Sequence, residues 1–396
     1  MIKALINLGL VLTPFIVIMG KDTRDPKMIV GIAIAVALGL LALKQGILRK
    51  FNNNWVFIFI GYLFVSYLLV PKPEIILFNI NVSHFWMWQP ILLILVFTLM
   101  TITIASLKLN KADIRCILNV MCWAGFLTAI YCVLQYFGIE QFFIRNQENA
   151  TQGHVGAALG QPVVASTWLA MLVPIMVYRR KWIMGAVTVT ALVMMQSQIA
   201  LGALVLSMAF YFCSFNKVIL AVFITLLVVS VPIGYYAYKN IPKVDKFVED
   251  NGRFVQWKTI WNDVMLPYNK EDNRTRASLT GYGIGSFYHV FHVKHNSQYY
   301  QAHNEYLEIL YGTGFIGLLI FLTMICKTIK HAFVYKNKYY MALLASFLCI
   351  CVSAGGLFVL QLQPHIYYVV VIIGLLYNQG GKENEEVLGN CSLLSS

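Results

Sequence analysis

The residues of this chain best suited to chemistry are His303 and Asn304, which lie in a polar segment just before an apolar run. A neutral imidazole can accept a proton from a sugar hydroxyl at physiological pH, because its unperturbed pKa lies near neutrality. Ionisable side chains at the edge of a membrane segment are functional candidates by default, because burying them is unfavourable. The alternative is an interfacial histidine that only fixes where the helix begins.

Three basic side chains are candidates for binding a diphosphate: Arg253, Arg145 and Lys294. A guanidinium group can bind two phosphate oxygens in a fixed planar geometry, which suits a diphosphate better than a lysine ammonium does. Each residue also has a plainer interpretation. Arg253 would be a surface arginine, Arg145 would extend its side chain to the membrane interface, and Lys294 would be a solvated loop charge.

No metal site is expected, although histidines recur near the end of the same polar segment. On a helix or a strand, the spacing of these histidines does not direct them to one tetrahedral centre. The eight cysteines have no suitable ligand spacing either. The histidines considered are His289, His292, His295 and His303.

No bound cofactor is expected. Gly281, Gly283 and Gly285 imitate the start of a dinucleotide-binding fingerprint. The strand–turn–helix context that gives this fingerprint its meaning is missing, so these glycines predict a flexible turn. Gly312, Gly314 and Gly317 predict either close helix packing or a tight turn into the next helix.

The elements that must position these residues are membrane helices. The chain has 396 residues, of which 59% are hydrophobic and 12% are charged, whereas soluble domains carry about 25% charge. Backbone groups cannot stay unpaired in lipid, so the long apolar stretches must be helical. We expect an all-α polytopic integral membrane protein with about twelve transmembrane helices, at roughly 4–20, 28–43, 55–70, 86–106, 116–138, 163–178, 182–197, 199–213, 218–237, 310–326, 341–358 and 366–377.

Charge predicts the orientation of these helices. The net charge of +13 is concentrated in short loops on the side of the N-terminus, which the positive-inside rule places in the cytoplasm together with the C-terminus. Nucleic acid is not an expected partner, because these charges form no groove-sized patch. The predicted organisation is helices one to nine in 1–237, a large extracytoplasmic loop in 238–309, helices ten to twelve in 310–377 and a cytoplasmic tail in 378–396.

The large loop is expected to contain short amphipathic helices. One stretch begins at Arg253 and has apolar residues at helical spacing, which is typical of a helix on a membrane surface. These apolar residues are Phe254, Trp257, Ile260 (or Trp261) and Val264.

The string His303-Asn304, nine residues, then Gly314-x-x-Gly317 resembles the signature of the O-antigen ligase family, whose relatives include O-antigen polymerases and protein O-oligosaccharyltransferases. The resemblance is detailed over about 250–325. Further segments are similar to family elements, namely Gly281–Phe287, Gly252-Arg253 with Trp257, and Gly160-Gln-Pro162. One departure is Gln198, where the family often carries an arginine.

The resemblance implies a GT-C-like fold and a metal-independent inverting glycosyltransferase without a cofactor. His303 would assist the acceptor hydroxyl, and Arg253, Arg145 and Lys294 would bind the diphosphate of the donor. The supporting residues would be Asn304, Gly314, Gly317 and Trp257.

The implied donor is a glycan on undecaprenyl diphosphate, and the implied place is the periplasmic face of a bacterial inner membrane. Ligation of O-antigen to lipid A–core is the favoured reaction. A polymerase that uses a second lipid-linked glycan as acceptor, a transferase to protein, and a lipid or glycan transporter remain alternatives.

Overall fold

The computed structural model describes most of the chain. The described residues are 1–16, 24–48, 53–69, 76–77, 80–81, 85–139, 159, 161–216, 253–265, 278–287, 291, 295, 301–357, 359–362 and 364–378. The predicted stretch at 218–237, residues 379–396 of the predicted tail, Arg145 and Lys294 lie outside these residues.

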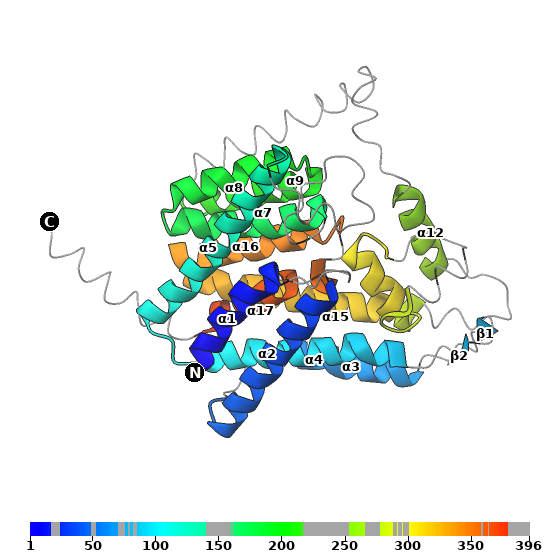
Figure 1. Cartoon of the computed structure of the whole chain (residues 1–396). Helices are drawn as coiled ribbons and strands as arrows, with labels where there is room; N and C mark the ends of the chain where they lie inside the picture. The colour runs from blue at the N-terminus through cyan, green and yellow to red at the C-terminus, as the bar shows by residue number, and fades with distance from the viewer. Residues whose placement is uncertain are drawn as a thin grey trace, which may run out of the picture.

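Helices make up nearly all of this part, and most of them lie side by side in one bundle, with α12 at its right-hand end in Figure 1. A pair of two-residue antiparallel strands, β1 and β2, lies outside the helices, and the all-α fold class is confirmed for the described part of the chain. The elements are α1 (Ile2–Phe15), α2 (Arg24–Lys44), α3 (Asn54–Leu69), β1 (Ile76–Leu77), β2 (Ile80–Asn81), α4 (Phe85–Ser106), α5 (Lys111–Tyr136), α7 (Pro162–Tyr178), α8 (Trp182–Met194), α9 (Gln198–Cys213), α12 (Arg253–Met265), α15 (Glu305–Tyr335), α16 (Lys338–Ser353), the 3-10 turn η3 (Val359–Gln361) and α17 (His365–Tyr377).

The apolar character of the helices indicates a membrane protein. Within the described residues, three helical segments are long and apolar enough to cross a membrane: Lys27–Lys44, Lys111–Tyr136 and Glu305–Tyr335. The other apolar helices there have 10–17 residues, fewer than the about 20 that a span typically needs. A helical membrane protein is thus confirmed in outline, and a total of twelve crossings stays a prediction.

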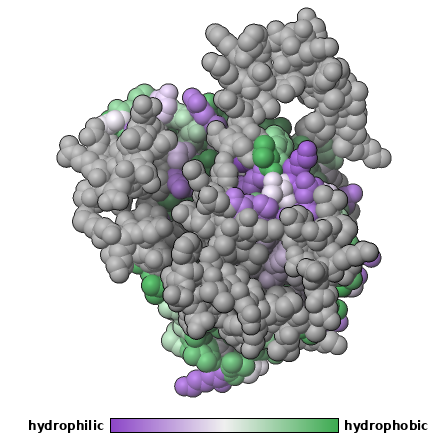
Figure 2. Space-filling model, turned by 90° about the vertical axis from the view of Figure 1, so that its right-hand side faces the viewer, coloured by the Kyte–Doolittle hydropathy of each residue, from purple (hydrophilic) through white to green (hydrophobic). Residues whose placement is uncertain are grey.

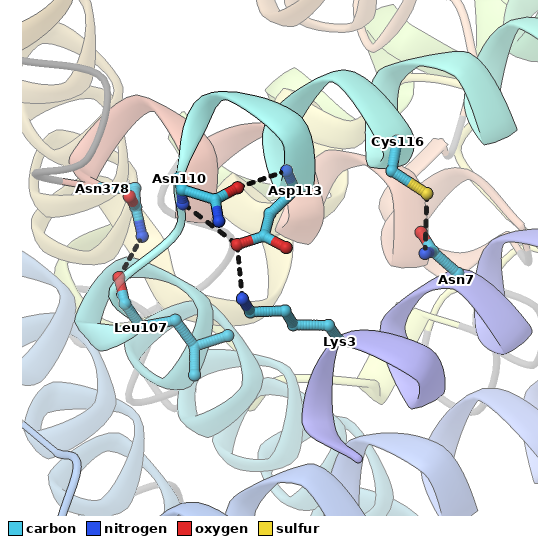
Figure 3. Close-up of polar contacts among 7 residues, drawn as sticks. All are labelled: Lys3, Asn7, Leu107, Asn110, Asp113, Cys116 and Asn378. Atoms are coloured by element: carbon cyan, nitrogen blue, oxygen red, sulfur yellow. Dashed lines mark hydrogen bonds and ion pairs between the residues drawn. The ribbon is translucent and has the colours of Figure 1, made fainter. Parts of the chain in front are cut away.

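One end of the bundle is held by polar contacts between helix ends (Figure 3). Asn110 caps α5 by accepting a hydrogen bond from the Asp113 amide at 2.8 Å, and the Asp113 carboxylate forms an ion pair with Lys3 of α1. The Asn378 side chain donates to the carbonyl of Leu107 at 2.8 Å. The first helix, the α4–α5 turn and the end of α17 therefore lie together.

Helix α15 is longer than its sequence prediction of 310–326. It begins at Glu305, because the Asn304 side chain caps it, and it ends beside Lys336 in the left-handed conformation. The apolar run marks only its central part. The polar first turns were missed because their side chains are satisfied by hydrogen bonds to neighbouring segments, which hydropathy does not report.

Candidate functional site

A kink at Gly314 shapes the membrane helix that leads away from His303. Gly314 has φ 63° and ψ −169°, inside α15. That region of backbone conformation is essentially restricted to glycine. The break leaves the carbonyls of Tyr311, Gly312 and Thr313 to be paired by groups from outside the helix, since an unpaired backbone group in an apolar setting is strongly unfavourable.

Two distant segments provide those partners. The amide of Tyr282 donates to the Tyr311 carbonyl at 2.9 Å, and the amide of Gly283 donates to the Gly312 carbonyl at 2.8 Å. The hydroxyl of Tyr62 on α3 donates to the Thr313 carbonyl at 2.6 Å. The kink is therefore the place where the large loop is fastened to the helix bundle.

Glycine is needed on both sides of this junction. Gly281 has φ 73°, and a Cβ there would overlap the backbone of Gly312 and Thr313. A Cβ at Gly314 would overlap the backbone of Leu279 and Thr280. The segment that the sequence predicted to be a flexible turn is thus a docked one, and Gly314 marks the kink instead of a helix-packing face.

Gly317 lies one turn beyond the kink. A Cβ there would overlap the side chain of Thr313 and approach the Tyr62 ring to 2.8 Å. Gly317 therefore makes room for Tyr62, whose hydroxyl donates a hydrogen bond to the Thr313 carbonyl. This role agrees with the close-packing alternative of the sequence prediction.

His303 stands directly before α15 in the left-handed conformation, with φ 49°. Histidine, asparagine and aspartate are the non-glycine residues found there more often than others. Its neighbour Asn304 accepts a hydrogen bond from the Leu307 amide at 3.1 Å and donates to the Gly355 carbonyl at 2.9 Å. Asn304 therefore caps α15 and ties its beginning to the segment directly after α16.

Helix α12 holds the backbone on the other side of His303. The Gln256 side chain donates to the Gln301 carbonyl at 3.0 Å, and the Trp257 indole donates to the Ala302 carbonyl at 2.8 Å. Arg253 lies one turn earlier on the same side of α12, because residues three and four apart share a helix face. Within the described part of the chain, Arg253 forms no hydrogen bond or ion pair.

Two glutamates next to His303 were missed by sequence reasoning. Glu308 accepts hydrogen bonds from the Ala302 amide at 3.3 Å and from the Gln361 side chain at 2.7 Å. Glu305 is only 5% exposed and accepts from the Leu360 amide at 3.0 Å. The available signal was their place in the first turn of a helix, where a carboxylate also interacts favourably with the helix dipole.

The two carboxylates join three segments around the histidine. Glu308 reaches back to the residue before His303, and Glu305 reaches the η3 turn that leads to α17. The bond to Glu308 and the bonds from α12 therefore hold the backbone of residues 301–302, directly before His303, from two sides.

His295 is a further histidine of the loop with a described partner. Its Nε2 lies 2.7 Å from the Asp263 carboxylate of α12. Among the described residues, no three His, Cys, Asp or Glu side chains form a group that could hold a metal ion. His289 and His292, like Arg145 and Lys294, lie outside the described residues.

The sequence assigned a single apolar face to α12, and the structure corrects this assignment. Ile260 and Val264 are buried against the protein, at 0% and 3% exposure, whereas Phe254 and Trp261 are 60% and 48% exposed. Helix α12 thus has two apolar faces. The spacing predicted the helix correctly but could not show which apolar residues face α15.

The turn that carries Gln198 is near the same end of the bundle. A Cβ on Gly356 would come within 2.6 Å of the Ile199 side chain, and the adjacent Gly355 binds Asn304. The departure from the family pattern therefore falls beside the segment that supports His303. Seen from this end, hydrophilic side chains gather around a small hydrophobic patch (Figure 2).

No family model matches the chain, and no curated protein matches it.

Replacing Trp257 by phenylalanine tests how the segment before His303 is held. The change leaves the Ala302 carbonyl without its indole donor, so we expect a loss of about 1–3 kcal/mol in unfolding free energy, the cost of an unsatisfied partly buried group. Thermal unfolding in detergent measures it. Trp261→Phe, on the exposed side of the same helix, is the matched control and should unfold at nearly the wild-type temperature. Equal effects of both changes would show that the bond to Ala302 does not hold the segment.

Proposed function

We propose that this protein transfers a glycan from undecaprenyl diphosphate to an acceptor hydroxyl at the outer face of the bacterial inner membrane. The observation that supports this proposal best is that four segments with a resemblance to the O-antigen ligase family meet in space. Hydrogen bonds join 253–257 to 301–304 and join 281–287 to 312–317. Helix α15, which begins directly after 304, connects the two pairs.

The proposed reaction needs only one base and fixed positive charge. As the acceptor oxygen attacks the anomeric carbon, its proton passes to the imidazole of His303. The bond from that carbon to the diphosphate oxygen breaks, and the configuration at the carbon inverts. Undecaprenyl diphosphate leaves with the electron pair. Diphosphate is already a good leaving group, so positioning and electrostatic stabilisation account for most of the required acceleration.

Arg253 is the described residue best placed to stabilise the departing diphosphate. Its guanidinium shares a helix side with Gln256 and Trp257, whose side chains hold Gln301 and Ala302. A charge that is not already committed to a carboxylate can pair with phosphate oxygens as they become more negative. Arg145 and Lys294 remain proposed partners in this role.

Among the reactions of this class, ligation to lipid A–core is the one we favour, on the form of the His-Asn and Gly-x-x-Gly string. Polymerisation onto a second lipid-linked glycan is distinguished from it by the acceptor that the protein uses. Transfer to a protein acceptor would give a third product. All three reactions share the donor, His303 and the diphosphate-binding charge.

Arg253 provides a direct test of the diphosphate site. Arg253→Ala is expected to lower the transfer rate by roughly 10²–10³-fold, the range for removing one electrostatic contact in the transition state. Arg253→Lys should recover only part of the rate, because a lysine cannot bind two phosphate oxygens in a fixed geometry. Transfer from the purified lipid-linked donor measures these rates. The control is Lys258→Ala, a loss of charge on the opposite side of α12, and an equal effect of that change would contradict the assignment.

A further inference from the structure

Helix α12 turns a second apolar face away from the protein. Phe254 and Trp261 lie seven residues apart, hence on one side of the helix, and are 60% and 48% exposed. The exposed Lys258 lies next to them on that side. We call these three residues the outer face of α12. The buried residues Gln256 and Ile260 point the other way, towards the bundle.

The outer face continues onto a membrane helix. The Trp261 ring contacts the Phe315 ring of α15 edge-on, with 6.3 Å between centroids. Ile316 and Leu319, the next outward residues of α15, are 40% and 61% exposed. Because α15 is one of the helices long and apolar enough to cross a membrane, we expect these outward side chains to meet lipid.

We infer that the outer face of α12 lies in the membrane interface and contacts phospholipid. Tryptophan and other aromatic rings favour the headgroup level, where one part of the ring is in hydrocarbon and the other is wet. Lys258 can extend its ammonium group to the lipid phosphates. The acidic residue of α12, Asp263, is turned away from this face and paired with His295, so it does not oppose the contact.

Bilayer lipid is the occupant that the geometry favours. The outer face is exposed along a helix and joins the outward side of α15 without a break, and a bilayer surface can cover both at once. A helix anchored in this way would keep Arg253 at the depth of lipid phosphates. That consequence rests on the proposed function, whereas the lipid contact itself does not.

Site-specific photo-crosslinking tests the contact. p-Benzoylphenylalanine is introduced separately at Phe254, Trp261 and Thr259 of the full chain, in nanodiscs made of phosphatidylcholine with an alkyne-tagged acyl chain. Thr259 is the matched control, because it is partly exposed on α12 but lies about 140° around the helix from Phe254 and about 160° from Trp261. After irradiation, tagged lipid on the protein is measured. We expect several-fold more at positions 254 and 261 than at 259.

Equal labelling at the three positions, or labelling at 259 alone, would overturn the inference, as would crosslinks to a second protein chain in place of lipid. The nanodiscs contain no glycan donor. The crosslinking result therefore does not depend on whether the protein transfers glycan.

Discussion

Gly314→Ala is expected to destabilise the protein and to abolish its activity together. A residue with a Cβ in the Gly314 conformation costs about 1–3 kcal/mol in backbone strain alone. The added Cβ would also overlap the backbone of Leu279 and Thr280, which cannot move aside as a flexible side chain can. We therefore expect a lower thermal unfolding temperature, and loss of transfer because the loop is no longer fastened beside His303.

Gly202→Ala is the matched control for this change. Gly202 lies inside α9, and nothing lies within 4 Å of the position of its Cβ. Alanine is favoured over glycine in a helix interior by roughly 0.5–1 kcal/mol, so this variant should be at least as stable as the wild type. If Gly314→Ala unfolded at the same temperature as Gly202→Ala, the kink and its docking to 279–283 would be wrong.

His303→Asn is expected to remove transfer while leaving the fold intact. Asparagine tolerates the left-handed conformation, so the change removes the imidazole without straining the backbone. Loss of a general base lowers the rate by about 10²–10⁴-fold. Initial rates of glycan transfer measure the effect, and an unchanged thermal unfolding temperature shows that the fold is kept.

A second histidine of the loop serves as the control for that result. His295→Asn breaks the contact with Asp263 but leaves the residues around His303 in place. It should keep transfer within a few-fold of the wild-type rate. If His303→Asn were as active as the wild type, His303 would not be the base, and a larger loss in His295→Asn would direct attention to the His295–Asp263 pair.

The helices could be predicted well because their signal is local. Apolar runs gave α3 and α7 to within one residue at each end, and helical spacing in a polar loop gave α12. The beginning of α15 could not be found in this way. Glu305 and Glu308 are polar and do not continue the apolar run. In the first turn of α15, Glu305 accepts a hydrogen bond from the Leu360 amide and Glu308 accepts one from the Gln361 side chain, and both partners are distant in the sequence.

The sequence named candidate residues for a site but could not show how those residues are arranged. The spacing of His303, Asn304 and the glycines identified the segment. The kink at Gly314 could not be predicted from local sequence. It leaves the Thr313 carbonyl to be paired from outside the helix, and the donor is the hydroxyl of Tyr62, which is far away in the sequence. The sequence also could not show which side of α12 packs against the protein, because apolar residues lie on two sides of that helix.

The central claim is tested most directly by glycan transfer with purified wild-type protein in proteoliposomes that contain undecaprenyl-diphosphate-linked glycan. Lipid A–core and a second lipid-linked glycan are supplied as separate acceptors. The proposed function predicts release of undecaprenyl diphosphate and a new inverted linkage, with lipid A–core as the acceptor used. A product on the second lipid-linked glycan alone would identify a polymerase. If folded protein released no undecaprenyl diphosphate with either acceptor or with a protein acceptor, glycan transfer would be contradicted.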